Sequence, residues 1–429
     1  MWIIGCKLVQ SVAAIIISAI SARYLGPSGF GIISFAAAIV AFAVPIMQLG
    51  ITDVIVRDLV EHPSEEGEII GTSLTLCCLS AALSILGIYA FITIASGNET
   101  ETVIVVLLYS LCLVFQALEV SVYWFQAKLQ SKYTSLISFG AYIIVSGYKI
   151  WLLVNGKSIY WFAVSNALDY MIIAAFQLIY YKKLGGAKLM FSRQIAKRLL
   201  NAGKYYIIPN LMIVIFANTD RIMLKYMIGA DATGQYSAAV VCAGMTGFVF
   251  VAIINSFRPV IFESASAEGN AFETFVLRLF RIIVVLSLLQ SIVICAFPAF
   301  FVKILYGDAY MSSVSALRII VWYTTFSYLG GAVGIWILAQ QQQKWLLLVN
   351  TLGAIGNVLL NLALIPRYGI CGAAAASFMT QFFTNVVIGL LIKPIRRGYI
   401  LILKAFDPRG WIGDITALTS GGNAHRDAR

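Results

Sequence analysis

The sequence predicts an all-α polytopic membrane protein with about twelve transmembrane helices. Hydrophobic residues make up 60% of the 429-residue chain and charged residues only 11%, which lies outside the range of soluble globular domains. Apolar stretches of about 20 residues, the length that crosses about 30 Å of hydrocarbon as a helix, recur along the chain. We place them near residues 2–21, 32–51, 69–95, 102–126, 134–155, 159–181, 205–228, 236–257, 282–302, 319–339, 345–365 and 370–392.

The charged residues test this placement, because a wrong one would scatter charges through the spans. The chain has 30 Lys and Arg and 19 Asp and Glu, and seven of these 49 fall inside the spans: Lys7, Glu119, Lys149, Asp169, Asp220, Arg221 and Lys225. The remaining Lys and Arg divide 21 to five between the two sides, with the larger number in the loops after even-numbered spans and in the tail. The positive-inside rule therefore places both termini in the cytoplasm.

Several function classes are excluded by composition. The net charge of +11 gathers beside the spans, where topology and anionic headgroups require it, so no nucleic-acid partner is expected. The seven cysteines lie in or at the edge of apolar spans, which implies neither disulfides nor a metal or cofactor site. Residues 156–158 resemble the end of a nucleotide-binding loop, but Trp151 stands where its first glycine belongs. Transport driven by an H⁺ or Na⁺ gradient is expected rather than an enzyme activity.

The spans divide into two halves of six, an N-terminal bundle at 1–181 and a C-terminal bundle at 205–393. Between them lies a basic cytoplasmic connector, 182–204, and a cytoplasmic tail, 394–429, follows the last span. Helical spacing within the connector predicts an interfacial amphipathic helix, with a solvated basic loop as the alternative.

A faint internal repeat supports the two halves. Four residues recur at an offset of 203, as Gly26, Gly31, Ser34 and Ala36 in one half and Gly229, Gly234, Ser237 and Ala239 in the other. Each set joins the first span of its half to the second, and duplication of this kind is common in secondary transporters.

The seventh span, 205–228, holds the strongest candidates for function. A charged side chain at the bilayer centre costs about 2.5–3.5 kcal/mol on insertion scales, so such residues usually face a bundle interior or an aqueous pathway. At about 100° per residue, Asn218, Arg221 and Lys225 share one face, and Asp220 lies at its margin. About 22 Å along the helix, Asp220 falls in the outer half of the membrane. The alternative is that these groups only satisfy one another and that Lys225 snorkels.

Other charges complete the candidate site. Asp169 lies near mid-membrane and Lys149 in the outer half, positions that allow an ion pair, which can be purely structural. Glu119 and Lys7 lie toward the cytoplasmic side, and Arg23 just outside the first span. Four positive against three negative intramembrane charges predict a mildly cationic cavity for an anionic cargo such as a pyrophosphate. We assign substrate binding to Arg221, Asn218, Lys225, Lys149, Arg23 and Lys7, and ion coupling to Asp220, Asp169 and Glu119.

Four segments of the chain resemble the Wzx-type polysaccharide repeat-unit flippases of the multidrug/oligosaccharidyl-lipid/polysaccharide (MOP) exporter superfamily. They are ARYLGPSGFGIISFA (22–36), NTDRIMLKYMIGADATGQYSAA (218–239), ILYGDAY (304–310) and NLALIPRYGICGAAAAS (361–377). The resemblance implies a bacterial inner-membrane protein of two pseudo-symmetric six-helix bundles around a central cavity, working by alternating access. The implied cargo is an oligosaccharide repeat unit on undecaprenyl pyrophosphate, moved to the periplasmic leaflet for O-antigen, capsule or exopolysaccharide assembly.

The resemblance also implies partners and leaves alternatives. Besides the lipid-linked oligosaccharide and the bilayer, a polysaccharide polymerase and a chain-length regulator are expected partners. A MATE-like multidrug antiporter carries cations and should have an acidic cavity, which the charge tally disfavours. A peptidoglycan-precursor flippase shares the pyrophosphate but often has extra spans. A membrane scaffold for polymerases would need none of the seven intramembrane charges.

Overall fold

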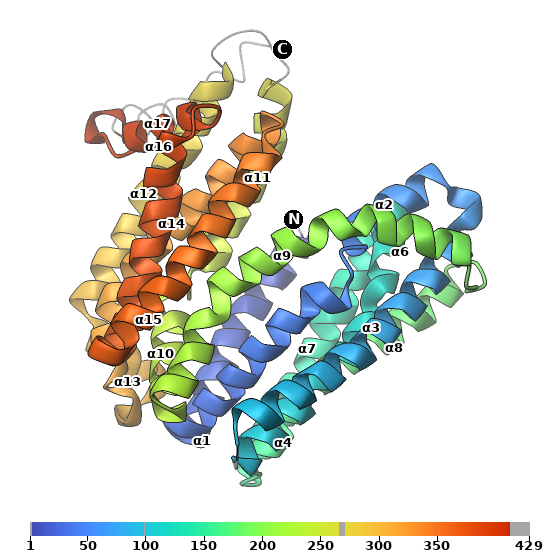
Figure 1. Cartoon of the computed structure of the whole chain (residues 1–429), viewed down its shortest axis with the longest axis horizontal. Helices are drawn as coiled ribbons and strands as arrows, with labels where there is room; N and C mark the ends of the chain where they lie inside the picture. The colour runs from blue at the N-terminus through green and yellow to red at the C-terminus, as the bar shows by residue number, and fades with distance from the viewer. Residues whose placement is uncertain (1, 98, 266–270, 412–429) are drawn as a thin grey trace. The chain divides into compact units, whose positions relative to one another are not determined.

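The computed structural model describes residues 2–97, 99–265 and 271–411, of which 2–9 and 271 are described as backbone alone. Within these ranges every regular element is a helix (Figure 1), which confirms the predicted all-α class. Ten helical stretches of the described residues are long and apolar enough to cross a membrane. Two of the ten each contain two predicted spans, so the ten stretches account for the twelve spans.

Both double stretches turn at a glycine. α1 (Trp2–Met47) is interrupted at Gly26, with φ 68° and ψ 173°, and α15 (Gln343–Phe382) at Gly369, with φ 58° and ψ −133°. A side chain makes these left-handed conformations costly, whereas glycine adopts them readily. Pro27, which follows Gly26, suits the first position of the new helix because that position needs no N–H. In the hairpin of α15, a Cβ on Gly372 would lie 2.2 Å from the carbonyl oxygen of Leu364, so the close approach also requires glycine.

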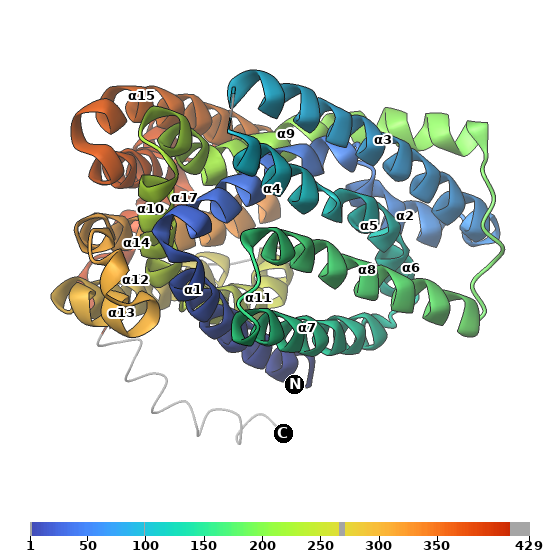
Figure 2. The same ribbon diagram turned by 90° about the horizontal axis from the view of Figure 1, so that it is seen from below.

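The chain forms two compact units, and unit 1 comprises Met1–Ser237 and Leu305–Tyr310. Its core is a continuous apolar cluster that includes Phe35, Ile55, Ile70, Leu113 and Phe125, all fully buried. α9 packs along α1 within this unit (Figure 2). The elements of unit 1 after α1 are α2 (Thr52–Glu61), η1 (Pro63–Glu65), α3 (Glu66–Ala95), α4 (Thr100–Ser110), α5 (Cys112–Leu118), η2 (Glu119–Ser121), α6 (Val122–Ala127), α7 (Ser131–Val154), α8 (Ile159–Lys183), α9 (Arg193–Met227), the first part of α10 (Ala230–Ala243), and η3 (Asp308–Tyr310).

Unit 2 comprises Ala238–Ile304 and Met311–Arg429. Its core includes Phe280, Ile283, Leu329, Trp336 and Ile402, which come from three helices. Its elements after α10 are α11 (Gly247–Ala265), α12 (Ala271–Ala296), α13 (Pro298–Tyr306), α14 (Ser313–Ala339), α15, the π-helix η4 (Phe383–Ile388), α16 (Gly389–Leu391) and α17 (Arg396–Ala405). α17 belongs to the predicted tail, and it packs against α12 and α14 because its apolar side chains complete this core.

The compact units differ from the predicted halves. The seventh span, expected to open the second half, packs inside unit 1, and the eighth breaks at residues 244–246 between α10 and α11. The connector is partly helical: residues 193–204 begin α9, and Ile195 and Leu199 bury the apolar face of this stretch in the core of unit 1. The predicted amphipathic helix therefore exists, and its apolar face covers protein.

Electrostatics explain why the connector follows this course. The side chain of Arg198 donates to Asp58 at 2.9 Å and to Glu65 at 2.7 Å. Upstream, the amide of Met190 donates to the carbonyl of Gly67 at 3.2 Å, where α3 begins. The basic connector is thus fastened to the acidic ends of α2 and α3.

Candidate functional site

The charges of the seventh span lie near the C-terminal end of α9, and the structure gives them different surroundings. Asp220 and Lys225 are buried, with 5% and 8% of their surfaces exposed, whereas Arg221 is half-buried. The three residues are therefore best considered by their separate partners.

Asp220 is bound by a neighbouring helix. The hydroxyl of Tyr236, on α10, donates to Oδ2 of Asp220 at 2.5 Å, and both side chains are buried. A hydrogen bond to a carboxylate is about twice as strong as one between neutral groups. The contact therefore fixes α10 against the end of α9.

Lys225 forms an ion pair with a loop acid. Its Nζ lies 2.5 Å from Oε2 of Glu99, between α3 and α4, and the hydroxyl of Thr102 donates to the same oxygen at 2.8 Å. Hydrogen bonds from Lys225 and Thr102 lower the pKa of the Glu99 carboxyl below its ordinary value. The ammonium of Lys225 is thus paired with a carboxylate of the protein. The assignment of Lys225 to cargo binding stays a prediction.

Arg221 has a different environment. Its Nη1 donates to Oδ1 of Asn218 at 2.9 Å, one turn back on α9. Within the part of the chain that the structure describes, no carboxylate forms an ion pair with it. Its charge interacts with the hydroxyl of Tyr109, on α4. Arg221 and Asn218, both predicted to bind cargo, therefore form one polar group on α9.

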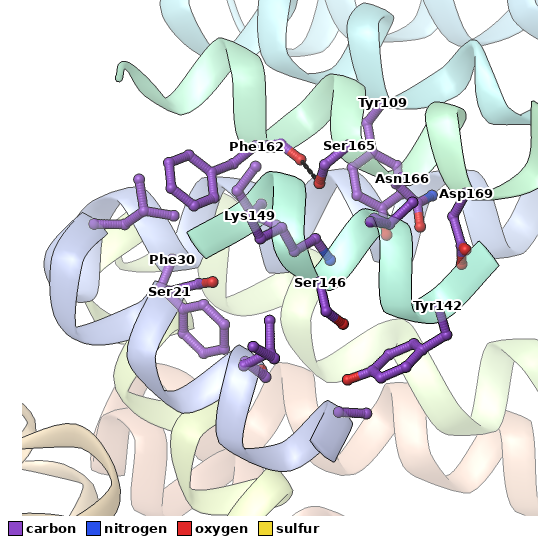
Figure 3. Close-up of a pocket in the computed structure, with 16 residues that line it drawn as sticks. Ser21, Phe30, Tyr109, Tyr142, Ser146, Lys149, Phe162, Ser165, Asn166 and Asp169 are labelled. Atoms are coloured by element: carbon purple, nitrogen blue, oxygen red, sulfur yellow. Dashed lines mark hydrogen bonds between the residues drawn. The ribbon is translucent and has the colours of Figure 1, made fainter. Parts of the chain in front are cut away.

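A cavity of about 170 Å³ lies within unit 1, and it contains two predicted site residues (Figure 3). Lys149 enters it from α7 and Asp169 from α8, and Tyr109 also lines it. The two charges interact but form no ion pair within 4.0 Å, so the predicted direct pair is absent from the described residues. The Oδ1 atom of Asp169 is buried without a hydrogen-bond partner among these residues.

The remaining predicted acid and base are less well placed. Glu119 lies in η2, a 3₁₀ turn that interrupts the fourth span, and its charge interacts with that of Asp169. A short 3₁₀ stretch inside a span often marks a hinge or a functional site. Lys7 lies outside the described side chains.

Arg23 joins a contact between distant segments at the end of unit 1 predicted to face the periplasm. Its Nε donates to the carbonyl of Leu305 at 2.8 Å, and the hydroxyl of Tyr310 donates to the carbonyl of Ala22 at 2.8 Å. Gln235, on α10, donates to the carbonyl of Ala309 at 2.8 Å. Parts of three of the four segments that carry the family resemblance therefore meet here. The role of Arg23 in cargo binding stays a prediction.

The predicted repeat appears in this region as a reciprocal contact. A Cβ on Gly31 would lie 1.8 Å from the carbonyl oxygen of Ala230, and one on Gly234 would lie 1.9 Å from that of Pro27. Gly234 follows Gly31, and Ala230 follows Pro27, by the repeat offset of 203 residues. Each helix thus presents the same surface to the other, as in an isologous, two-fold contact.

Sequence reasoning missed Glu99, Tyr236 and Tyr109. Glu99 had a usable signal, since an acid in an outward loop and Lys225 near the outer end of its span lie at the same membrane level. No signal in the sequence distinguished Tyr236 or Tyr109, because a single tyrosine in an apolar stretch is usually a core residue.

Comparison with known sequences identifies the family. Residues 1–265 match the family described as polysaccharide biosynthesis protein. An uncharacterised membrane protein of Methanocaldococcus jannaschii is 25% identical over 244 residues, which cover 52% of this chain and 47%, about half, of that protein. A Shigella flexneri protein to which O-antigen transport is ascribed is 23% identical over 376 residues, covering 82% of this chain and 87% of that protein.

Solved structures show the same fold. The lipid II flippase MurJ superposes with a TM-score of 0.74 at 12% identity, covering 93% of this chain and 89% of MurJ. A MATE-family multidrug resistance transporter of the MOP superfamily gives 0.67 at 14% identity, covering 93% of this chain and 96% of that transporter. These proteins are transporters and not catalytic enzymes. The chain belongs to the polysaccharide biosynthesis protein family and has the multi-pass, two-bundle fold of MOP transporters, which confirms the predicted resemblance.

Proposed function

We propose that this protein is a flippase for lipid-linked oligosaccharide repeat units. It moves them from the cytoplasmic to the periplasmic leaflet of the inner membrane by alternating access, for surface polysaccharide assembly. The polysaccharide family supports the sugar part of the cargo, and the transporter fold supports movement across the bilayer. The undecaprenyl pyrophosphate part rests on the site.

The observation that carries this part is the state of Arg221. Its neighbours Asp220 and Lys225 are engaged by Tyr236 and Glu99, whereas no described carboxylate pairs with Arg221. An unpaired cation within a membrane protein is costly unless it serves a binding or transport pathway. A guanidinium binds phosphate oxygens through parallel charge-assisted hydrogen bonds, so a pyrophosphate is the fitting counter-ion.

The test expresses Arg221 variants of the protein in a strain from which the chromosomal gene has been deleted. Arg221→Ala should abolish surface polysaccharide while membrane levels stay normal, because losing a charge-assisted hydrogen bond weakens binding about ten- to 150-fold. Arg221→Lys should keep part of the export, since Lys retains the charge without the planar geometry.

Arg57→Ala is the matched control, because Arg57 is an exposed arginine of unit 1 that pairs with Glu61, one turn away. Normal polysaccharide with Arg221→Ala would remove the observation on which the pyrophosphate cargo depends. If the protein were a multidrug exporter, Arg221→Ala would leave its transport intact, and deletion of the gene would change drug resistance.

Ion coupling is part of the proposal, with Asp220, Asp169 and Glu119 as the candidate carriers. Asp169 and Glu119 lie within electrostatic reach of each other. Because Tyr236, on α10, donates a hydrogen bond to Asp220, ion exchange at Asp220 would be linked to movement of α10.

A further inference from the structure

The cavity between α1, α4, α7 and α8 is lined by polar groups, several of which have no role in the proposed function (Figure 3). Besides Lys149 and Asp169, its wall includes Ser146 and Asn166, and the hydroxyl of Ser21 reaches it from the opposite side. The Ser21 hydroxyl and Oδ1 of Asp169 are both buried without partners among the described residues. Buried polar atoms without partners cost free energy, so their arrangement around a cavity indicates an occupant that satisfies them.

The charges of the cavity indicate a neutral occupant. Lys149 and Asp169 face the same space, carry opposite charges and form no ion pair within 4.0 Å. Because the ammonium of Lys149 and the carboxylate of Asp169 both line the cavity, their opposite charges give no net preference for a cation or an anion. A neutral molecule with both hydrogen-bond donors and acceptors satisfies both groups.

The walls also present apolar faces. Phe30, Tyr109, Tyr142 and Phe162 line the cavity together with the polar groups. Such a combination of aromatic rings and a few placed polar side chains is typical of sites for small molecules. A sugar ring matches it, because its edge carries hydroxyl groups and its faces carry C–H groups that pack on aromatic rings.

We propose that this cavity is the seat of one sugar ring of the cargo, a neutral hexose or N-acetylhexosamine. Asp169 accepts hydrogen bonds from ring hydroxyls, and Lys149 and Asn166 donate to ring or carbonyl oxygens. The volume of about 170 Å³ is large enough for a single sugar ring.

The position of the cavity fits this assignment, which rests on the proposed flippase function. Tyr109 lines the cavity and lies within electrostatic reach of Arg221, so the predicted pyrophosphate position is near the wall of the sugar seat. A cargo that places its pyrophosphate at Arg221 brings the first sugar next to Tyr109.

The test measures binding of free sugars to the purified full-length protein in nanodiscs by saturation-transfer NMR. The probes are galactose, N-acetylglucosamine and glucuronic acid, with sodium pyrophosphate and NaCl as separate additions. We expect signals from a neutral sugar and none from glucuronic acid. Asp169→Asn should weaken binding about tenfold or more, and Ser146→Ala about three- to tenfold.

The matched control is Ser135→Ala, because Ser135 lies on the same helix, donates to the carbonyl of Ser131 and does not line the cavity. The proposal is overturned by the absence of signal from every sugar, or by sugar binding that Asp169→Asn and Ser146→Ala leave unchanged. A different result would identify the cavity as an ion site: NaCl stabilises the protein, Asp169→Asn removes that stabilisation, and no sugar gives a signal. Export by the Arg221 variants is measured separately, so the flippase function and the sugar seat can fail independently.

Discussion

The reciprocal glycine contact in unit 1 makes a quantitative prediction about Gly31 and Gly234. Each glycine lets its helix approach a carbonyl oxygen of the other, at distances of 1.8 Å and 1.9 Å from the place where a Cβ would stand. Cβ atoms are essentially never found within 3.0 Å of another heavy atom. Gly31→Ala or Gly234→Ala must therefore separate the two helices by more than an ångström.

The cost follows from two opposing effects. Overpacking costs about 1–3 kcal/mol, and a clash with backbone, which cannot rotate away, belongs at the upper end. Alanine recovers about 1 kcal/mol through its better helix propensity. Each single substitution should thus destabilise unit 1 by about 2 kcal/mol. Once the helices have separated, the second Cβ meets free space, so the double variant should cost no more than one single variant, a coupling of about 2 kcal/mol.

Thermal unfolding of the purified protein in nanodiscs measures both values. For a unit of this size, about 2 kcal/mol lowers the midpoint by about 4–8 °C. Gly87→Ala, on α3, is the control, because a Cβ there would meet no atom of the described residues within 4 Å. If either single variant unfolds at the temperature of Gly87→Ala, or if the double variant loses the sum of the single losses, the inferred contact is wrong.

Two further predictions concern ionisable groups. The folded-state pKa of Glu99 lies below its ordinary value of 4.5, so the stabilisation is complete above that pH and is lost as the pH falls through the folded pKa. Because the Glu99 side chain is 56% exposed, we expect a contribution of only about 0.2–1 kcal/mol. Glu99→Gln should remove this part of the difference between the thermal unfolding midpoints measured above pH 4.5 and well below it. In vesicles, Asp220→Asn should reduce gradient-driven flipping to the rate without a gradient. Unchanged stimulation by the gradient would remove Asp220 from coupling.

Hydropathy and charge were sufficient to predict the fold class and most spans, because a bilayer imposes the length and composition of its helices. They could not predict the break between α10 and α11, since the apolar run continues through residues 244–246. The start of the ninth span was also placed late: Arg278 and Arg281 indicated a loop, but both lie within α12. Charges near a helix end reach water or a partner without ending the helix.

The candidate site was predictable in part for a similar reason. Helical periodicity placed Asn218 and Arg221 on one face, and their hydrogen bond agrees with that spacing. Periodicity along one helix says nothing about the next helix, so it could not show that Lys149 and Asp169 share a cavity without pairing. Contacts between helices depend on packing and are the part that needs the structure.

The partners of α9 show why a count of intramembrane charges is an incomplete guide to cargo. By sequence, Asp220, Arg221 and Lys225 contribute a net charge of +1, and all three were candidates for binding or coupling. In the structure, Glu99 forms an ion pair with Lys225, and Tyr236 donates a hydrogen bond to Asp220. Arg221 is then the cation of the three for which no described carboxylate forms an ion pair. The anionic preference of the site then depends on one guanidinium supported by Asn218. Loss of Lys225 should accordingly affect stability more than export, whereas loss of Arg221 should do the reverse.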